Sequence, residues 1–179
     1  MKPPIGSGLG SGGYVVIGAG VSAVGLAAGV SRFLAVESCG QCTACKEDGC
    51  EISGLLDDLA HGAGQSDHLT RIDGRLLSVA DGARCSLARQ HQSVVTSVID
   101  AFRGEFESQL APTAEPMEVL LVSALVSLGD GGAELDESFL DKQPDWSYEP
   151  NESGKTPVER LTDHRAVDPR PGPELDAAP

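Results

Sequence analysis

Apolar side chains recur at intervals of three and four residues in three stretches of the chain, which is the spacing of helix faces that pack together, and an earlier stretch is apolar almost throughout. We predict helices over residues 21–36 and 50–61, a third helix capped by Ser66 or Asp67, and a long helix over residues 88–110. The apolar stripes of the last three helices are Ile52, Leu55, Leu56 and Leu59; Leu69, Ile72, Leu76 and Leu77; and Val94, Val95, Val98, Ile99, Phe102 and Phe106. The pattern predicts a mainly α fold, a small antiparallel helical bundle.

Glycine, proline and acidic residues divide the chain around this bundle. We predict a Gly-rich entry loop and short strand in residues 1–19, the bundle in 20–111, a hairpin and docking segment in 112–150, and a disordered, acidic, Pro-rich tail in 151–179. The strand is expected at residues 14–17. The β-hairpin is expected from the apolar run 117–128 and the turn that starts at Asp130.

Composition narrows the classes of function. The 179 residues carry a formal net charge of −14, so the basic stripe that nucleic-acid binding requires is missing and we expect no nucleic-acid partner. Residues 14–30 are uncharged but rich in glycine, and Lys2 is the only basic residue ahead of them. This run therefore predicts a buried strand and helix rather than a signal peptide or membrane span. We expect a cytoplasmic protein, at most peripheral to a membrane complex.

Three cysteines at Cys39-x2-Cys42-x2-Cys45 are the strongest chemical signal. Closely spaced thiols in a protein that is not secreted indicate metal or redox chemistry rather than disulfides. Zinc sites more often use two separated Cys-x-x-Cys pairs or mixed Cys and His ligands, whereas three thiolates in one loop suit three corners of a [4Fe–4S] cluster. The spacing predicts an iron–sulfur cluster that needs a fourth ligand.

Two cysteines are candidates for that fourth ligand. Cys85 follows a predicted helix end and precedes the long helix, so the bundle can carry it to the loop. Cys50 begins a predicted helix, where a cysteine more often acts as a small buried side chain. Helix placement favours Cys85, although spacing alone allows either residue.

The segment that begins at Glu37, Glu-Ser-Cys-Gly-Gln-Cys-Thr-Ala-Cys-Lys-Glu-Asp-Gly, resembles the iron–sulfur region of the flavoprotein subunit of respiratory complex I. It also resembles related NAD-linked hydrogenases and formate dehydrogenases. Arg84-Cys85-Ser-Leu is similar to the family's distal ligand motif, and the resemblance extends over residues 9–110. It implies a [4Fe–4S] cluster on Cys39, Cys42, Cys45 and Cys85, an electron-transfer role without catalysis of its own, and flavoprotein or other oxidoreductase subunits as partners.

The chain also departs from that family. The domain that binds NADH and flavin mononucleotide precedes this region in the family and has no counterpart in the sequence, so we expect this chain alone to bind neither NAD nor FMN. Asp48 displaces a family glycine, and Cys50 is extra. The run Gly18-Ala-Gly-Val-Ser-Ala imitates a dinucleotide-binding turn, with Glu37 near the ribose-binding distance, but no further β-α units follow.

Other interpretations stay open. A metal-stabilised interaction module and a truncated gene product are the alternatives to an electron-transfer protein. Lys46 and Arg84, beside the ligands, are expected to raise the cluster potential. His61 and His68 are expected in a solvated loop. Trp146 lies in an acidic segment between prolines, either as a strap on the bundle or as an anchor for a partner.

Overall fold

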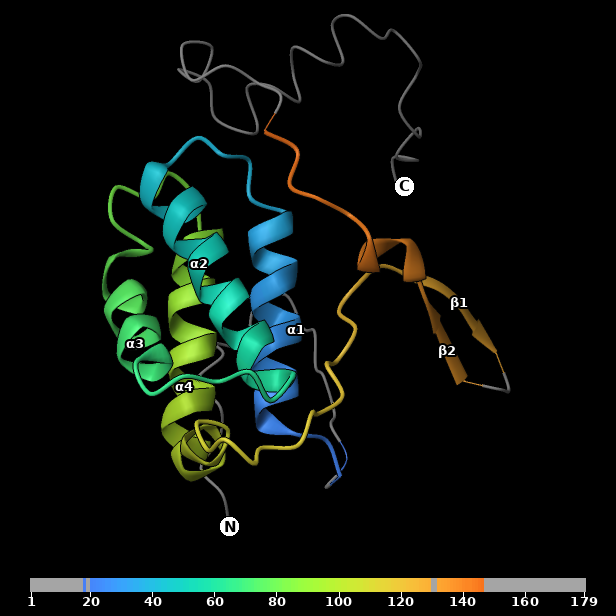
Figure 1. Ribbon diagram of the computed structural model, residues 1–179. Helices are drawn as coiled ribbons and strands as arrows, with labels where there is room; N and C mark the ends of the chain where they lie inside the picture. The colour runs from blue at the N-terminus through green and yellow to red at the C-terminus, as the bar shows by residue number, and fades with distance from the viewer. Residues whose placement is uncertain (1–17, 19, 130–131, 147–179) are drawn as a thin grey trace, which may run out of the picture. The chain divides into compact units, whose positions relative to one another are not determined.

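Four α-helices form a bundle in the computed structural model, which describes residues 18, 20–129 and 132–146 (Figure 1). The helices are α1 (Ala23–Val36), α2 (Thr43–Ala60), α3 (His68–Ser78) and α4 (Leu87–Ser108). The mainly α prediction is confirmed. The predicted strand at residues 14–17, the centre of the hairpin turn and the predicted tail lie outside the described residues.

Successive helices run in opposite directions, as the course of the chain in Figure 1 shows. The end of α1, the start of α2, the end of α3 and the start of α4 therefore lie at one end of the bundle. The α1–α2 connection and the α3–α4 connection, which both contain cysteines, are at this end. We call it the cysteine end.

The core is aliphatic, as the low aromatic content of 4% requires. Its fully buried large side chains come mainly from α2, α3 and α4 and include Ile52, Leu56, Leu59, Ile72, Val95, Val98, Ile99 and Phe106. These residues occupy the predicted stripes. Leu77 is the exception: it is 80% exposed, and of these two adjacent leucines only Leu76 faces the core.

The second helix begins earlier than predicted. Helix α2 starts at Thr43, not at Cys50, so Cys45 lies in its first turn and Cys50 in its interior. Residues 43–49 have no apolar stripe, so the sequence pattern did not indicate a helix there. They also contain no proline, so nothing prevents the helix from starting at Thr43. The three-cysteine segment is thus part loop and part helix.

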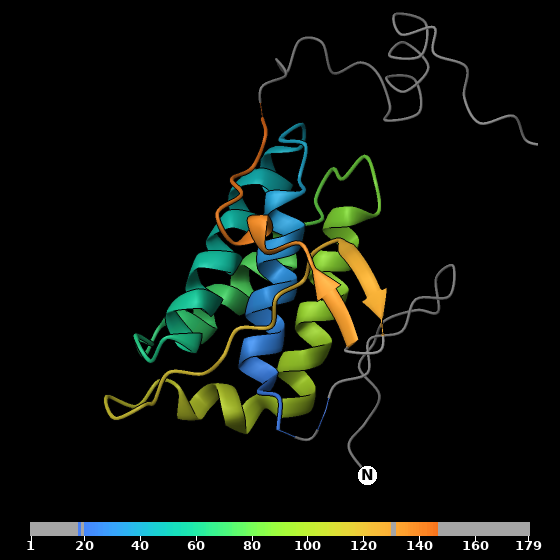
Figure 2. The ribbon, with the colours of Figure 1, turned by 90° about the vertical axis from the view of Figure 1, so that its right-hand side faces the viewer.

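Helix α4 bends at Phe102, whose φ of −130° and ψ of 24° are not helical, and its last turns run across the bundle (Figure 2). The bend positions Glu105 at the start of α1. There its carboxylate accepts hydrogen bonds from the Ser22 hydroxyl and the Ala23 amide, both at 2.8 Å. An acidic side chain at a helix N-terminus stabilises the helix.

The segment after α4 packs closely on α1 through two glycines. Figure 2 shows it running along that helix. The Leu120 amide donates to the Gly25 carbonyl at 3.1 Å, and the Met117 amide donates to the Ala60 carbonyl at 2.7 Å. A Cβ placed on Gly29 would lie 1.9 Å from the Leu120 carbonyl oxygen. Only glycine permits this approach of backbone to helix.

The predicted hairpin is present but shorter than expected. Strands β1 (Leu125–Gly129) and β2 (Gly132–Leu135) pair antiparallel, with Leu128 opposite Ala133. The apolar run was expected to be strand from residue 117, yet its first half contacts α1 instead. A 3-10 turn, η1 (Glu137–Leu140), follows the hairpin. None of the helices in the described part of the chain has the length and apolar character of a membrane span.

A Gly29→Ala variant tests the close contact on α1. We expect the free energy of unfolding to fall by about 1–3 kcal/mol, because the new methyl group displaces the Leu120 backbone. Gly54→Ala is the matched control, since nothing lies within 4 Å of a Cβ there and alanine favours a helix by about 1 kcal/mol. Urea unfolding measures both variants. Equal stabilisation by the two changes would contradict the packing.

Candidate functional site

The cysteine end carries the four cysteines of the predicted ligand set, and none of the five cysteines forms a disulfide. Cys39 lies in the α1–α2 connection, Cys42 is the N-cap of α2, and Cys45 lies in the first turn of that helix. Cys85 lies two residues before α4. Cys39 and Cys85 are exposed. The fold thus brings the predicted distal ligand to the end where the three closely spaced cysteines lie.

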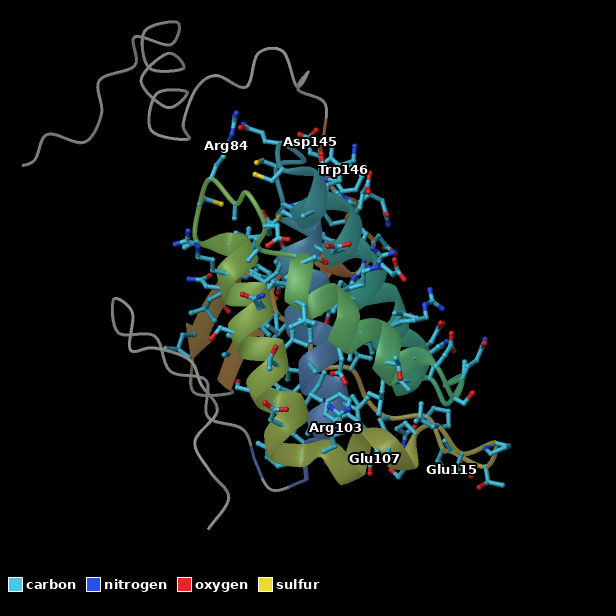
Figure 3. All side chains as sticks on the ribbon, turned by 90° about the vertical axis from the view of Figure 1, so that its left-hand side faces the viewer. Arg84, Arg103, Glu107, Glu115, Asp145 and Trp146 are labelled. Carbon is cyan, nitrogen blue, oxygen red and sulfur yellow. The ribbon has the colours of Figure 1, made fainter. Side chains whose placement is uncertain are left out.

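A glycine turn and a hydrogen bond determine the course of the loop that carries Cys39. Gly40 has a φ of +72°, a left-handed conformation that favours glycine and turns the chain between Cys39 and Cys42. The Arg84 guanidinium donates to the Gln41 side-chain oxygen at 3.2 Å. Arg84 precedes Cys85, so this bond joins the two cysteine-bearing connections. Figure 3 shows Arg84 and Trp146 at the end where the sulfur atoms gather.

The pKa of the Cys45 thiol depends on the other four cysteines. Its pKa is raised from 9.0 to about 11, mainly because it is partly buried, and then by negative charge on Cys42, Cys85, Cys39 and, least, Cys50. A thiol whose pKa is raised by the charges of its neighbours lies close to them, and a bound cation favours its ionised form. Four thiols at one end of the bundle fit the donor set of an iron–sulfur cluster, whose ligands are thiolates.

Two helix starts also face this end of the bundle. Helix α2 begins after its N-cap Cys42 and α4 after its N-cap Ser86, and neither N-cap side chain hydrogen-bonds to its helix. Amide groups in the first turn of a helix carry partial positive charge. An anionic group held by the cysteines would therefore lie near two favourable helix ends.

Asp48 fastens this site to the bundle. Its side chain is buried, and it accepts hydrogen bonds from Arg75 at 3.0 Å and from Ser78 at 2.7 Å. Arg75 also pairs with Glu51 at 2.8 Å. These contacts join the first half of α2 to the end of α3, so Asp48 has a structural role here.

His91 is a buried polar residue that the sequence reasoning missed. Its Nε2 atom lies 2.7 Å from the Ser31 hydroxyl of α1, and its ring packs on Gly49 of α2. The signal was its position in the α4 stripe, four residues before Val95 and seven before Val98. Burial lowers the pKa of His91 from 6.5 to about 4, so the ring is neutral at pH 7.

The depressed pKa of His91 predicts a pH dependence. Below about pH 6.5 the unfolded chain binds a proton at His91, whereas the folded chain binds this proton only near pH 4 and below. Stability should therefore fall through this window by up to about 1.4 kcal/mol per pH unit. Urea unfolding at pH 7.5 and 5.5 measures the loss. We expect a smaller loss in His91→Gln and an unchanged one in the exposed control His61→Gln; a loss in His91→Gln as large as in wild type would contradict the assignment.

The other candidate residues are placed as follows. His61 is exposed, but His68 is buried at 2% exposure, so its expected solvated position is wrong; it is the first residue of α3. Cys50 is half-buried, and its pKa is raised by burial against an opposing effect of the Lys46 ammonium. No three His, Cys, Asp or Glu side chains among the described residues are already set as ligands of a single metal ion.

The residues that imitate a dinucleotide-binding turn are occupied by other contacts. The start of α1, where such a turn would bind phosphate, already receives the Glu105 carboxylate. Glu37 pairs with Lys142. A groove of about 620 Å³ opens at this helix start, and it is lined by both Glu105 and Glu118. Carboxylates in this position oppose the binding of a phosphate.

Comparison with known proteins gives a family match. Residues 25–109 match the model of the NADH-ubiquinone oxidoreductase-F iron-sulfur binding region. The matched residues include all five cysteines and the whole of the four helices apart from the first two residues of α1.

Individual relatives match over 88 to 111 residues. NADP-reducing hydrogenase subunit HndC of Solidesulfovibrio fructosivorans is 29% identical over 111 residues, which are 62% of this chain and 23% of that protein. An NADH-quinone oxidoreductase subunit of Rickettsia felis is 29% identical over 105 residues, 59% of this chain and 25% of the relative. The corresponding protein of Streptomyces coelicolor is 30% identical over 88 residues, 49% and 20% respectively. The chain therefore spans about a quarter or less of the length of these relatives.

Proposed function

We propose that the chain holds one [4Fe–4S] cluster and transfers electrons through it, because residues 25–109 match the NADH-ubiquinone oxidoreductase-F iron-sulfur binding region. The proposed ligands are Cys39, Cys42, Cys45 and Cys85. The observation that carries the proposal is the gathering of these thiols at one end of the bundle, where the charge of each of the others raises the pKa of Cys45.

The four thiolates would hold the cluster, which supplies the acceptance and release of single electrons. Charges around it would set how easily it is reduced. Lys46 and Arg84 are the basic residues next to the ligands, and positive charge there favours the reduced state. The Arg84–Gln41 hydrogen bond would hold the two ligand-bearing connections together.

The electrons would come from a flavin in a partner chain of an NAD-linked oxidoreductase. The relatives are named as subunits of a hydrogenase and of NADH-quinone oxidoreductases, which supports oxidoreductase subunits as partners. Exposed free thiols at Cys39 and Cys85 suit a reducing compartment such as the cytoplasm.

Anaerobic reconstitution with iron and sulfide tests the proposal. We expect about four iron and four sulfide per chain, a broad absorbance of iron–sulfur charge transfer, and loss of that absorbance on reduction with dithionite. Zinc without sulfide in the purified chain would favour the metal-stabilised interaction module instead. Co-purification with a flavoprotein would distinguish an electron-transfer component of a complex from a product without a partner.

NADH binding provides a further prediction. We expect no binding of NADH in the micromolar range by titration calorimetry, and no NADH oxidation when free flavin and an artificial acceptor are added. The reason is that Glu105 fills the one glycine-rich helix start in the described part of the chain that resembles a phosphate site. Glu105→Gln, which removes the negative charge at this helix start, serves as the control variant. Specific micromolar binding by wild type would restore the dinucleotide-binding interpretation.

A further inference from the structure

The residues that follow the hairpin cross the end of α1 and reach the cysteine loop. We call residues 137–146 the C-terminal strap. Phe139 is buried with its ring centroid 5.5 Å from that of Phe33, Lys142 pairs with Glu37, and Arg32 donates to a backbone carbonyl of the strap. The strap is therefore attached to α1 by an aromatic contact, an ion pair and a backbone hydrogen bond.

The strap ends with Trp146 on the loop that carries Cys39. The indole N–H donates to the carbonyl oxygen and to the hydroxyl of Ser38, both at 3.1 Å. A Cβ placed on Gly40 would lie 2.7 Å from the indole ring, so the ring rests directly on the Gly40 backbone. The ring thus covers the residues between two proposed ligands.

The same ring holds Lys46. Its ammonium lies 4.4 Å from the ring centroid, within the range of a cation–π interaction. Lys46 directly follows Cys45 in the sequence. Without the indole, the flexible lysine side chain would be free to extend into water.

We propose that Trp146 is a positioning residue of the cluster site, which shields the Cys39–Cys42 loop from solvent and keeps the Lys46 ammonium close to that loop. The proposal rests on the proposed function, since the shielded group is the cluster. It gives the strap an intrachain role: Trp146 faces its own site rather than a partner. Positive charge held near a cluster stabilises the added electron, so Trp146 raises the reduction potential through Lys46.

The test compares Trp146→Ala, Trp146→Phe and Lys46→Met with wild type, and uses Leu128→Ala as a control because that hairpin residue is 75% exposed. After anaerobic reconstitution, cluster loss to an iron chelator is followed by absorbance, and the reduction potential is measured by redox titration. We expect Trp146→Ala to lose its cluster about tenfold faster than wild type. Leu128→Ala should match wild type.

The potential distinguishes positioning from mere packing. It should fall in Trp146→Ala and in Lys46→Met, and the double variant should fall no further than Lys46→Met, because both changes act through the same ammonium. Trp146→Phe keeps a ring over Lys46 and should retain most of the potential while losing the cluster faster. Wild-type loss rate and potential in Trp146→Ala would overturn the proposal.

Fluorescence gives a readout that needs no variant. Trp146 is the only tryptophan among the 179 residues, so its emission reports this contact alone. In the chain without cluster we expect protection from the neutral quencher acrylamide, and on cluster assembly we expect strong loss of emission. Free access of acrylamide would overturn the proposal even if Trp146→Ala failed to fold. Failure of wild type to assemble a cluster would instead defeat the proposed function.

Discussion

A Cys42→Ser variant is expected to lose its cluster and to melt at a clearly lower temperature than wild type. The proposed ligands lie in the α1–α2 connection, at the start of α2 and just before α4, so a group bound by all four would cross-link two parts of the bundle. Binding energy at structural metal sites in small domains is folding energy and is comparable with a total stability of about 5–15 kcal/mol. Circular dichroism melting and iron and sulfide assays measure the two losses.

The substitution separates metal binding from helix stability. Cys42 is the N-cap of α2, and serine is among the preferred residues at that position, so the helix itself should not be weakened. Cys50→Ser is the matched control, because it makes the same atomic change at a cysteine outside the proposed ligand set. An unchanged melting curve in Cys42→Ser, with the cluster absent, would defeat the structural half of this prediction.

Cys85→Ala should abolish cluster assembly, whereas Cys50→Ala should leave iron and sulfide content near the wild-type level. Negative charge on Cys85 raises the pKa of Cys45 more than negative charge on Cys50 does, so the distal thiol acts more strongly on the site. Cys50 follows Cys45 by five helical positions, which turns its side chain about 140° away around α2.

The comparison requires equal folding of the two variants before reconstitution, which far-ultraviolet circular dichroism checks. Iron and sulfide assays after anaerobic reconstitution then compare their cluster content. If Cys50→Ala loses the cluster and Cys85→Ala keeps it, the fourth ligand is Cys50. Partial loss in both variants would indicate that the two cysteines share the position.

Sequence periodicity predicted α2, α3 and α4 because each buries an apolar stripe with the spacing of three and four residues, whereas α1 was predicted from a run that is apolar almost throughout and is buried on nearly every side. It placed the start of α2 too late, since residues 43–49 are helical without contributing a large apolar side chain to the core. Leu77 was assigned to the α3 stripe although its neighbour Leu76 takes the buried position. Adjacent leucines leave this choice to the tertiary packing.

The proposed ligands could be selected from cysteine spacing and family resemblance, but their surroundings could not. Nothing near Trp146 in the sequence indicates that it contacts Ser38, which lies 108 residues earlier. Glu105 reaches the start of α1 only because α4 bends at Phe102. The apolar run from Met117 was expected to be a strand throughout. Its first half instead contacts the glycine face of α1, and the local sequence could not indicate this because the glycines lie about 90 residues earlier.

The glycine contact on α1 also sets the shortest fragment that should fold. The family match ends at residue 109, yet Gly25 and Gly29 are covered by backbone that follows it. A protein cut at residue 110 would leave the Gly25 and Ala60 carbonyls without their partners from residues 117–120 and would uncover part of the α1 surface. Expression of the isolated bundle should therefore extend at least through residue 120, so that the folding unit is larger than the region that sequence comparison delimits.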